Sequence, residues 1–261
     1  MIRVAILLAA VAANGGAAVR YIGCPVYRDT DNGRKSGCWL VEDEASGVRY
    51  DVTAAPTKPD WNHAVLVEGV QSAAAGDPCG GTVLEPARVS VLEEGCTRHM
   101  LAAEGYQGRR FALPERNVRP LYEERKRPDR PFADGRFTIP FDYQSRFITY
   151  QLSDYYLDAT INYALDVQPA GIEVTGFADV RKVEVSGRTI AEPASLARER
   201  AELVRNALIM RGIAADRITV RVGRGGAPFV PAAFDGLAAP AARRVDIRIV
   251  PELSEARRGT P

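Results

Sequence analysis

Residues 195–212 read SLARERAELVRNALIMRG, and this stretch is the clearest helix in the chain. Pro193 lies just upstream, Ser195 can cap the first turn, and Gly212 can end the helix. On a helical wheel the apolar side chains fall within an arc of roughly 180°. They are Leu196, Ala197, Ala201, Leu203, Val204, Ala207, Leu208 and Met210. The pattern predicts an amphipathic helix that buries one face.

Segments with strand and helix patterns lie on both sides of this helix. Residues 171–176, 217–222 and 244–250 alternate apolar and polar side chains, residues 137–141 form a further strand, and residues 153–168 have helical spacing. The resulting order is β-α-β-α-β-β. It predicts an α+β sandwich in which both helices pack on one face of a mixed sheet.

Arg200 lies inside the apolar arc of the helix, and a buried arginine needs a partner. Asp179 follows the strand that ends at Gly176, and loops at strand ends often carry functional residues. Two interpretations remain open. The two side chains pair with each other, or they bind a zwitterion together, with Asp179 on the ammonium and Arg200 on the carboxylate.

Three motifs in order resemble those of the OmpA-like peptidoglycan-binding domain. They are GFAD at 176–179, LARERA at 196–201 and RRVDI at 243–247, against the family patterns G-H-T-D, L-S-x-x-R-A and N-R-R-V-E. The resemblance spans residues 136–250. It implies that Asp179 and Arg200 bind the diaminopimelate side chain of the peptidoglycan stem peptide. It also implies that Arg244, Phe177 and Ala178 lie at the same site.

The chain departs from the family pattern at several polar positions. Phe177 and Ala178 stand in place of His and Thr, Ala197 in place of Ser, and Ala242 in place of Asn. Residues 180–194 are also unlike the family's usual short loop. These departures favour an alternative, in which the domain has lost its ligand and acts as a protein interaction module in an envelope assembly.

The first half of the chain has the pattern of a small all-β domain over residues 19–113. Short β-rich runs at 48–52, 64–70, 82–84 and 88–92 alternate with turn clusters, which predicts five or six strands in an OB-like shape. All cysteines lie here, namely Cys24, Cys38, Cys79 and Cys96. In an exported protein an even number predicts two disulfides, whose pairing stays open. Zinc is disfavoured because no CxxC pair occurs.

Three further segments complete the predicted organisation. Residues 1–18 have the charged start, apolar run and small residues of a signal peptide. A lipoprotein acylated at Cys24 is the alternative, disfavoured because Tyr21 is bulky where Leu is usual. Residues 114–135 are rich in proline and arginine and predict a linker. Residues 252–261 are predicted to be a disordered tail.

Composition and motifs restrict the function. The formal net charge is +1, so no overall field favours nucleic acid. The chain has no HExxH, GxSxG or P-loop motif, so we expect no enzyme activity, metal or cofactor. The prediction is a periplasmic protein of the Gram-negative cell envelope, at the outer membrane or cell wall. Its C-terminal domain would bind peptidoglycan, and its β domain could bind another envelope protein. No transmembrane segment is expected in the mature chain.

Overall fold

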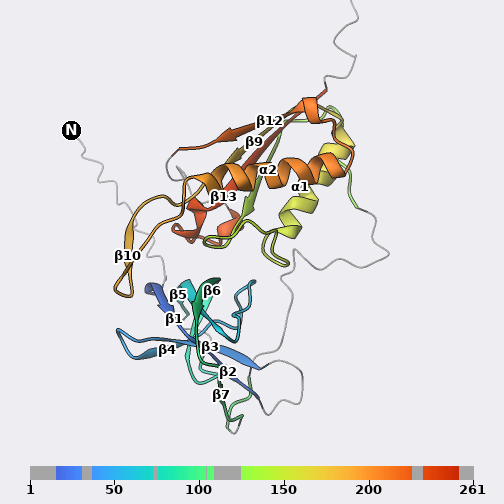
Figure 1. Cartoon of the computed structure of the whole chain (residues 1–261). Helices are drawn as coiled ribbons and strands as arrows, with labels where there is room; N and C mark the ends of the chain where they lie inside the picture. The colour runs from blue at the N-terminus through green and yellow to red at the C-terminus, as the bar shows by residue number, and fades with distance from the viewer. Residues whose placement is uncertain are drawn as a thin grey trace, which may run out of the picture.

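The computed structural model describes residues 16–30, 37–72, 76–103, 105–108, 125–224 and 232–252. Most of the predicted signal peptide, residues 114–124 of the predicted linker and nearly all of the predicted disordered tail lie outside these residues. The described chain forms a β-rich N-terminal unit, residues 16–108, and a C-terminal unit with both α-helices, residues 125–252 (Figure 1). None of the helices in these ranges is long and apolar enough to cross a membrane.

The N-terminal unit is built on one seven-stranded sheet, in the order β1-β5-β6-β4-β3-β2-β7. Its strands are β1 Ala18–Gly23, β2 Pro25–Arg28, β3 Cys38–Asp43, β4 Val48–Asp51, β5 His63–Gln71, β6 Thr82–Gly95 and β7 His99–Leu101. The pairs β4–β6 and β2–β7 are parallel, and the others are antiparallel. The all-β prediction is confirmed, with seven strands instead of the five or six expected, whereas the OB-like shape stays a prediction.

The two short runs predicted at 82–84 and 88–92 are in fact one strand, β6. Pro86 lies between the two runs, and proline cannot donate a ladder hydrogen bond. In the structure the pairing register of β5 with β6 shifts between Gly69 and Gln71, close to Pro86. Such irregular pairing accommodates a proline within a long strand.

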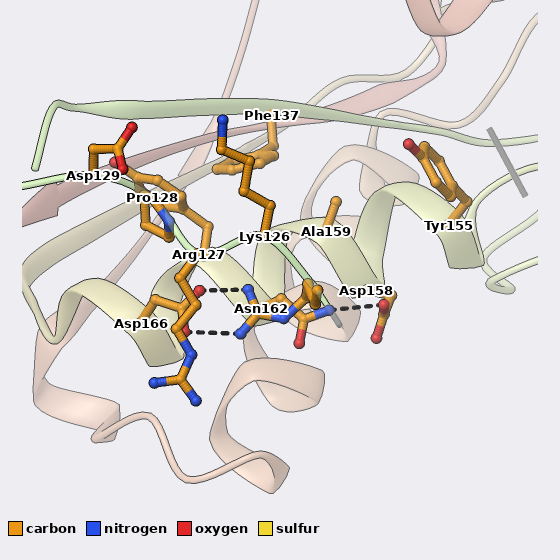
Figure 2. A pocket seen from close by; sticks show the side chains of 12 residues that line it. Lys126, Arg127, Pro128, Asp129, Phe137, Tyr155, Asp158, Ala159, Asn162 and Asp166 are labelled. Atoms are coloured by element: carbon orange, nitrogen blue, oxygen red, sulfur yellow. Dashed lines mark hydrogen bonds and ion pairs between the residues drawn. The ribbon is translucent and has the colours of Figure 1, made fainter. Parts of the chain in front are cut away.

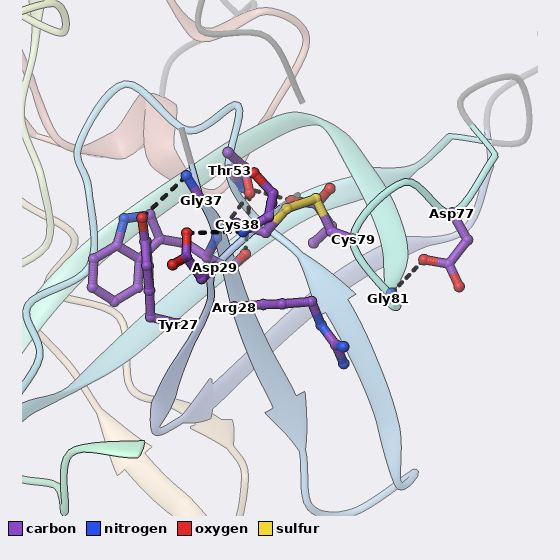
Figure 3. Close-up of a disulfide and its surroundings, with 12 residues drawn as sticks. Tyr27, Arg28, Asp29, Gly37, Cys38, Thr53, Asp77, Cys79 and Gly81 are labelled. Atoms are coloured by element: carbon purple, nitrogen blue, oxygen red, sulfur yellow. Dashed lines mark hydrogen bonds between the residues drawn. A yellow bond between two sulfur atoms is a disulfide. The ribbon is translucent and has the colours of Figure 1, made fainter. Parts of the chain in front are cut away.

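Two disulfides join the strands of the N-terminal unit, as predicted. Cys24 bonds to Cys96 and Cys38 bonds to Cys79, with Cα–Cα distances of 5.7 and 5.8 Å. Figure 3 shows the Cys38–Cys79 disulfide. Both cysteines are fully buried and pack against Leu40. The sulfur of Cys24 is bonded to Cys96, so it is not available to carry an acyl chain in this structure.

The C-terminal unit confirms the predicted α+β fold. Its elements are β8 Gly135–Pro140, α1 Asp154–Val167, β9 Pro169–Gly176, β10 Val183–Val185, β11 Arg188–Ile190, α2 Ser195–Met210, β12 Ile218–Val222 and β13 Arg244–Pro251. The main sheet has the order β12-β9-β13-β8, with β12 parallel to β9. The helices α1 and α2 lie on one face of this sheet (Figure 1). The β10–β11 hairpin is an addition that the sequence pattern did not predict.

Helix α2 buries a narrower face than its apolar arc suggested. Ala201, Val204 and Leu208 are fully buried in the core between the helices and the sheet. Met210 is 80% exposed, because it lies at the edge of the arc and in the last residue of the helix. The predicted cap at Ser195 is also wrong. The N-cap position is Ala194, and no side chain caps the helix there.

Candidate functional site

Arg200 is the centre of the predicted site, and it is completely buried. Its Nη2 lies 2.6 Å from Oε1 of Glu192, and its Nη1 lies 2.9 Å from Oε2. Three backbone carbonyls accept its other hydrogen bonds, namely those of Ser145, Phe177 and Asp142, at 2.9, 3.1 and 3.1 Å. A guanidinium has five N–H donors, so each one has an acceptor here.

Glu192 supplies the carboxylate for this arginine. It comes from residues 180–194, the segment that differs from the family's usual loop. Besides the two bonds from Arg200, it accepts hydrogen bonds from the backbone N–H groups of Asp179 and Gln144, both at 2.8 Å. Burial raises the pKa of the Glu192 carboxyl, but the hydrogen bonds and charge of Arg200 outweigh burial and hold this pKa below its usual value. Glu192 is therefore a buried anion, and its carboxylate is bound by Arg200 and by two backbone N–H groups.

Asp179 lies beside this site but does not pair with Arg200. Its carboxylate is 3% exposed and faces two other arginines. Oδ1 lies 3.3 Å from Nε of Arg181, and Oδ2 lies 3.8 Å from Nη2 of Arg20 in β1. The backbone carbonyl of Asp179 accepts a hydrogen bond from the N–H of Glu192 at 2.8 Å. Neither interpretation from the sequence describes this arrangement, because Glu192 lies between the two predicted residues.

The other predicted site residues lie at the adjacent ends of β9 and β13. Arg244 is 3% exposed, and its guanidinium carbon lies 3.8 Å above the ring of Phe177. It also donates from Nε to both carboxylate oxygens of Asp246 and from Nη1 to the carbonyl of Ala241. Phe177 reaches Arg200 only through its carbonyl, and Ala178 is half-buried with its carbonyl bonded to the N–H of Val180. Arg244 therefore supports the strand ends.

Comparison with known proteins identifies similar folds among solved structures. No protein-family model matches the chain, and no curated protein matches it. The OmpA-like domain of FopA1 from Francisella tularensis is 15% identical, with 45% of this chain and 73% of that chain covered and a TM-score of 0.35. The peptidoglycan-associated lipoprotein from Burkholderia pseudomallei is 21% identical, with 43% and 89% covered and a TM-score of 0.33. The cell wall anchor of the T6SS from Pseudomonas aeruginosa is 23% identical, with 46% and 82% covered and a TM-score of 0.33.

The chain is similar to OmpA-like domains. This similarity concerns the fold. The site differs from the one predicted from the sequence, because Glu192 is the carboxylate that binds Arg200. A signal for Glu192 was present in the sequence. A buried Arg200 requires a carboxylate, and Glu192 directly precedes the proline at the start of the same helix.

Asp142 is a second buried carboxylate that sequence reasoning missed. Its Oδ2 accepts hydrogen bonds from the hydroxyls of Thr57, at 2.8 Å, and Thr149, at 3.3 Å. Burial raises the pKa of Asp142 to about 6, and these bonds together with the charges of Arg243 and Arg88 oppose that rise. Thr57 belongs to the N-terminal unit, so Asp142 lies at the interface between the two units.

The N-terminal unit contacts the β10–β11 hairpin that precedes Glu192. The N–H of Ile22 donates to the hydroxyl of Ser186 at 2.9 Å, and Arg188 forms an ion pair with Glu94. Val185 packs in a buried cluster with Ile22 and with Leu66 of β5, among others. Figure 1 shows the hairpin extending from the C-terminal unit alongside β1.

Buried charges also connect the two units. Glu68 of β5 lies 3.0 Å from Nε of Arg20 and pairs with both terminal nitrogens of Arg243, which precedes β13. Both Glu68 and Arg243 are almost completely buried. The interface therefore combines apolar packing with a network of paired charges.

A cavity of about 530 Å³ lies elsewhere, between residues 125–129 and helix α1 (Figure 2). In it the guanidinium of Arg125 binds both carboxylate oxygens of Asp166, and Asn162 donates to Asp158 at 2.8 Å. Neither Asp179 nor Arg200 lines this cavity. The described end of the predicted linker thus packs on the C-terminal unit.

Proposed function

We propose that this chain is a non-catalytic protein of the cell envelope that associates with peptidoglycan through its C-terminal unit. Arg200 would hold a carboxylate of diaminopimelate, and Asp179 would hold its ammonium group. One observation supports the proposal above all. The surroundings of Arg200 form a complete carboxylate site, with a bidentate guanidinium and two backbone N–H groups.

The chemistry of the ligand matches the two charges of the site. Each amino acid end of diaminopimelate carries an ammonium and a carboxylate on one carbon. Asp179 and Arg200 are adjacent, since the N–H of Asp179 and the guanidinium of Arg200 bind the same oxygen of Glu192. The two disulfides support a periplasmic location, because disulfides persist in oxidising compartments.

The complete burial of Arg200 favours a second candidate function. In this alternative the Glu192 pair is permanent, and the C-terminal unit is a protein interaction module in an envelope assembly. The buried pair would then only fix the start of α2 against residues 142–145. The two candidates differ in whether an external carboxylate can replace Glu192.

Co-sedimentation of the full chain with purified sacculi tests the proposal. We expect retention of the wild-type protein, and loss of retention in Asp179→Ala and Arg200→Ala. Arg198→Ala is the matched control, because Arg198 is an exposed arginine on the same helix. Retention that is unchanged in Asp179→Ala and Arg200→Ala would contradict the proposal. Absence of retention, together with co-purification of a stable partner protein, would favour the interaction module.

A further inference from the structure

We infer that Glu192 is an internal competitor of the peptidoglycan ligand and that the N-terminal unit holds it in the site. This inference rests on the proposed function. The stem peptide can bind only when the β10–β11 hairpin leaves the N-terminal unit. The N-terminal domain would thus control access to the site of the C-terminal domain.

Every N–H donor of Arg200 is already used within the protein. Glu192 takes one hydrogen bond from each terminal nitrogen, and three carbonyls take the remaining ones. A second carboxylate therefore finds no free donor on this arginine. Because the guanidinium is completely buried, an incoming carboxylate also has no path to it while Glu192 is in place.

The surroundings of Asp179, where the ligand's ammonium group would bind, are also occupied. Asp179 faces the guanidinium groups of Arg181 and Arg20, where the proposed ligand would place an ammonium group. Arg20 belongs to β1 of the N-terminal unit. The Glu192 carboxylate is thus bound to Arg200, and two guanidinium groups lie beside Asp179. These internal charges occupy the positions that we propose for the carboxylate and the ammonium of the ligand. One of these cations comes from the N-terminal unit itself.

Contacts with the N-terminal unit hold the residues that precede Glu192. The carbonyl of Ala191, its neighbour in the chain, accepts a hydrogen bond from the hydroxyl of Tyr143 at 3.1 Å. The N–H of Tyr143 donates to the hydroxyl of Ser90 in β6 at 2.8 Å. On the hairpin, Val185 is 4% exposed in its cluster with the N-terminal unit, and Ser186 accepts the bond from Ile22. The residues before Glu192 are therefore attached to the N-terminal unit at several points.

The consequence is a reduced apparent affinity of the intact protein. When only a fraction of molecules has an open site, the measured dissociation constant rises by the inverse of that fraction. Removal of Glu192 abolishes the competition, and loosening the hairpin weakens it. Couplings between sites commonly change affinity by roughly 5- to 150-fold, so we expect effects in that range.

Isothermal titration of the full chain with meso-diaminopimelate tests the competitor. We expect Glu192→Ala and Glu192→Gln to bind at least about tenfold more tightly than the wild type. Glu184→Ala is the matched control, because it removes an exposed glutamate from the same hairpin and should leave the affinity unchanged. Cadaverine, which has both amino groups of diaminopimelate but neither carboxylate, should bind none of these proteins. Circular dichroism checks that each variant folds. If Glu192→Ala does not fold, the affinity of Glu192→Gln is the deciding measurement.

The role of the N-terminal unit needs variants outside the site. We expect the double variant Val185→Ala and Ser186→Ala to bind diaminopimelate more tightly than the wild type, by a smaller factor than Glu192→Ala. Amide hydrogen exchange over residues 183–194 should rise in parallel. Thr189→Ala, an exposed change on the same hairpin, is the control.

The possible results separate this inference from the proposed function. Equal affinities of wild type and Glu192→Ala would overturn the internal competitor while leaving peptidoglycan binding intact. Tighter binding by Glu192→Ala, with no change in the hairpin variant, would overturn the role of the N-terminal unit. A folded Glu192→Gln protein that binds neither diaminopimelate nor sacculi would refute the proposed function itself.

Discussion

At the scale of single residues, the buried side chains of Arg200 and Glu192 are each held by several hydrogen bonds. Arg200 has an acceptor for every donor, and Glu192 accepts four hydrogen bonds. The pKa of Glu192 is lowered as a result, whereas burial dominates at Asp142 and raises its pKa to about 6. The pKa values of these two buried carboxyls are thus shifted in opposite directions.

Asp142→Asn should change how stability depends on pH. The pKa of Asp142 is raised from 3.8 to about 6 on folding, so the folded state binds this proton more tightly than the unfolded state. The contribution of Asp142 to stability should therefore fall as pH rises from about 4 to about 6 and level off above, so the wild type should lose stability relative to Asp142→Asn over this range. The loss attributable to Asp142 is on the order of 2–3 kcal/mol. Urea unfolding at several pH values measures it for both proteins.

The variant provides its own control, because the asparagine side chain is neutral throughout and its amide oxygen can accept the same threonine bonds. The opposite effect of Glu192 is common to both proteins and cancels in the difference between their unfolding free energies. Parallel stability curves for the two proteins between pH 4 and 7 would contradict the raised pKa.

At the scale of elements, the site depends on a close approach of strand β9 to helix α2. A Cβ atom at Gly176, the last residue of β9, would lie 1.8 Å from the carbonyl oxygen of Ala197 in α2. Only glycine allows this contact. The approach brings the carbonyl of Phe177 within hydrogen-bond distance of Arg200. The glycine of the GFAD motif is thus required for packing.

Gly176→Ala should destabilise the protein because backbone atoms must move apart. Overpacking of a core typically costs about 1–3 kcal/mol, and a backbone clash puts this variant at the upper end or beyond. The matched control is Gly171→Ala in the same strand, where a Cβ meets nothing within 4 Å. We expect the control to change the free energy of unfolding by less than about 0.5 kcal/mol. Equal urea midpoints for the two variants would contradict the close approach.

At the scale of the whole molecule, the two units are joined by an interface that buries charges and apolar side chains. Glu68 pairs with Arg20 in its own unit and with Arg243 in the other. The hairpin adds Val185 and Ser186 to this interface. Because Glu68, Arg243 and Val185 are buried, we expect the two units to unfold together in the wild type.

Glu68→Ala should weaken this coupling. It leaves Arg243, which is 1% exposed, without its carboxylate, and an unpaired buried charge costs about 3–5 kcal/mol. Calorimetry should show a lower melting temperature and a separation into two transitions. In the control Glu173→Ala, an exposed pair with Arg221 is lost, and such pairs contribute about 0–1 kcal/mol. A single transition at the wild-type temperature would show that Glu68 does not couple the units.

Local pattern alone determined much of this protein. Alternation and helical spacing predicted the order β-α-β-α-β-β, because a strand or helix with one buried face repeats its apolar residues at a fixed period. The even number of cysteines, together with the expectation that the protein is exported, predicted two disulfides. The position of Arg200 in the apolar arc predicted a buried cation that needs a partner.

Only the tertiary structure decided which groups meet. The disulfide pairing, the continuity of β6 past Pro86 and the contacts between the units depend on residues that are distant in the sequence. The same holds for the central site. Asp179 and Arg200 were predicted either to pair with each other or to hold a zwitterion together, and Glu192 occupies the position between them. Sequence pattern indicates that a charge is buried, whereas its partner is set by how segments distant in the sequence pack together.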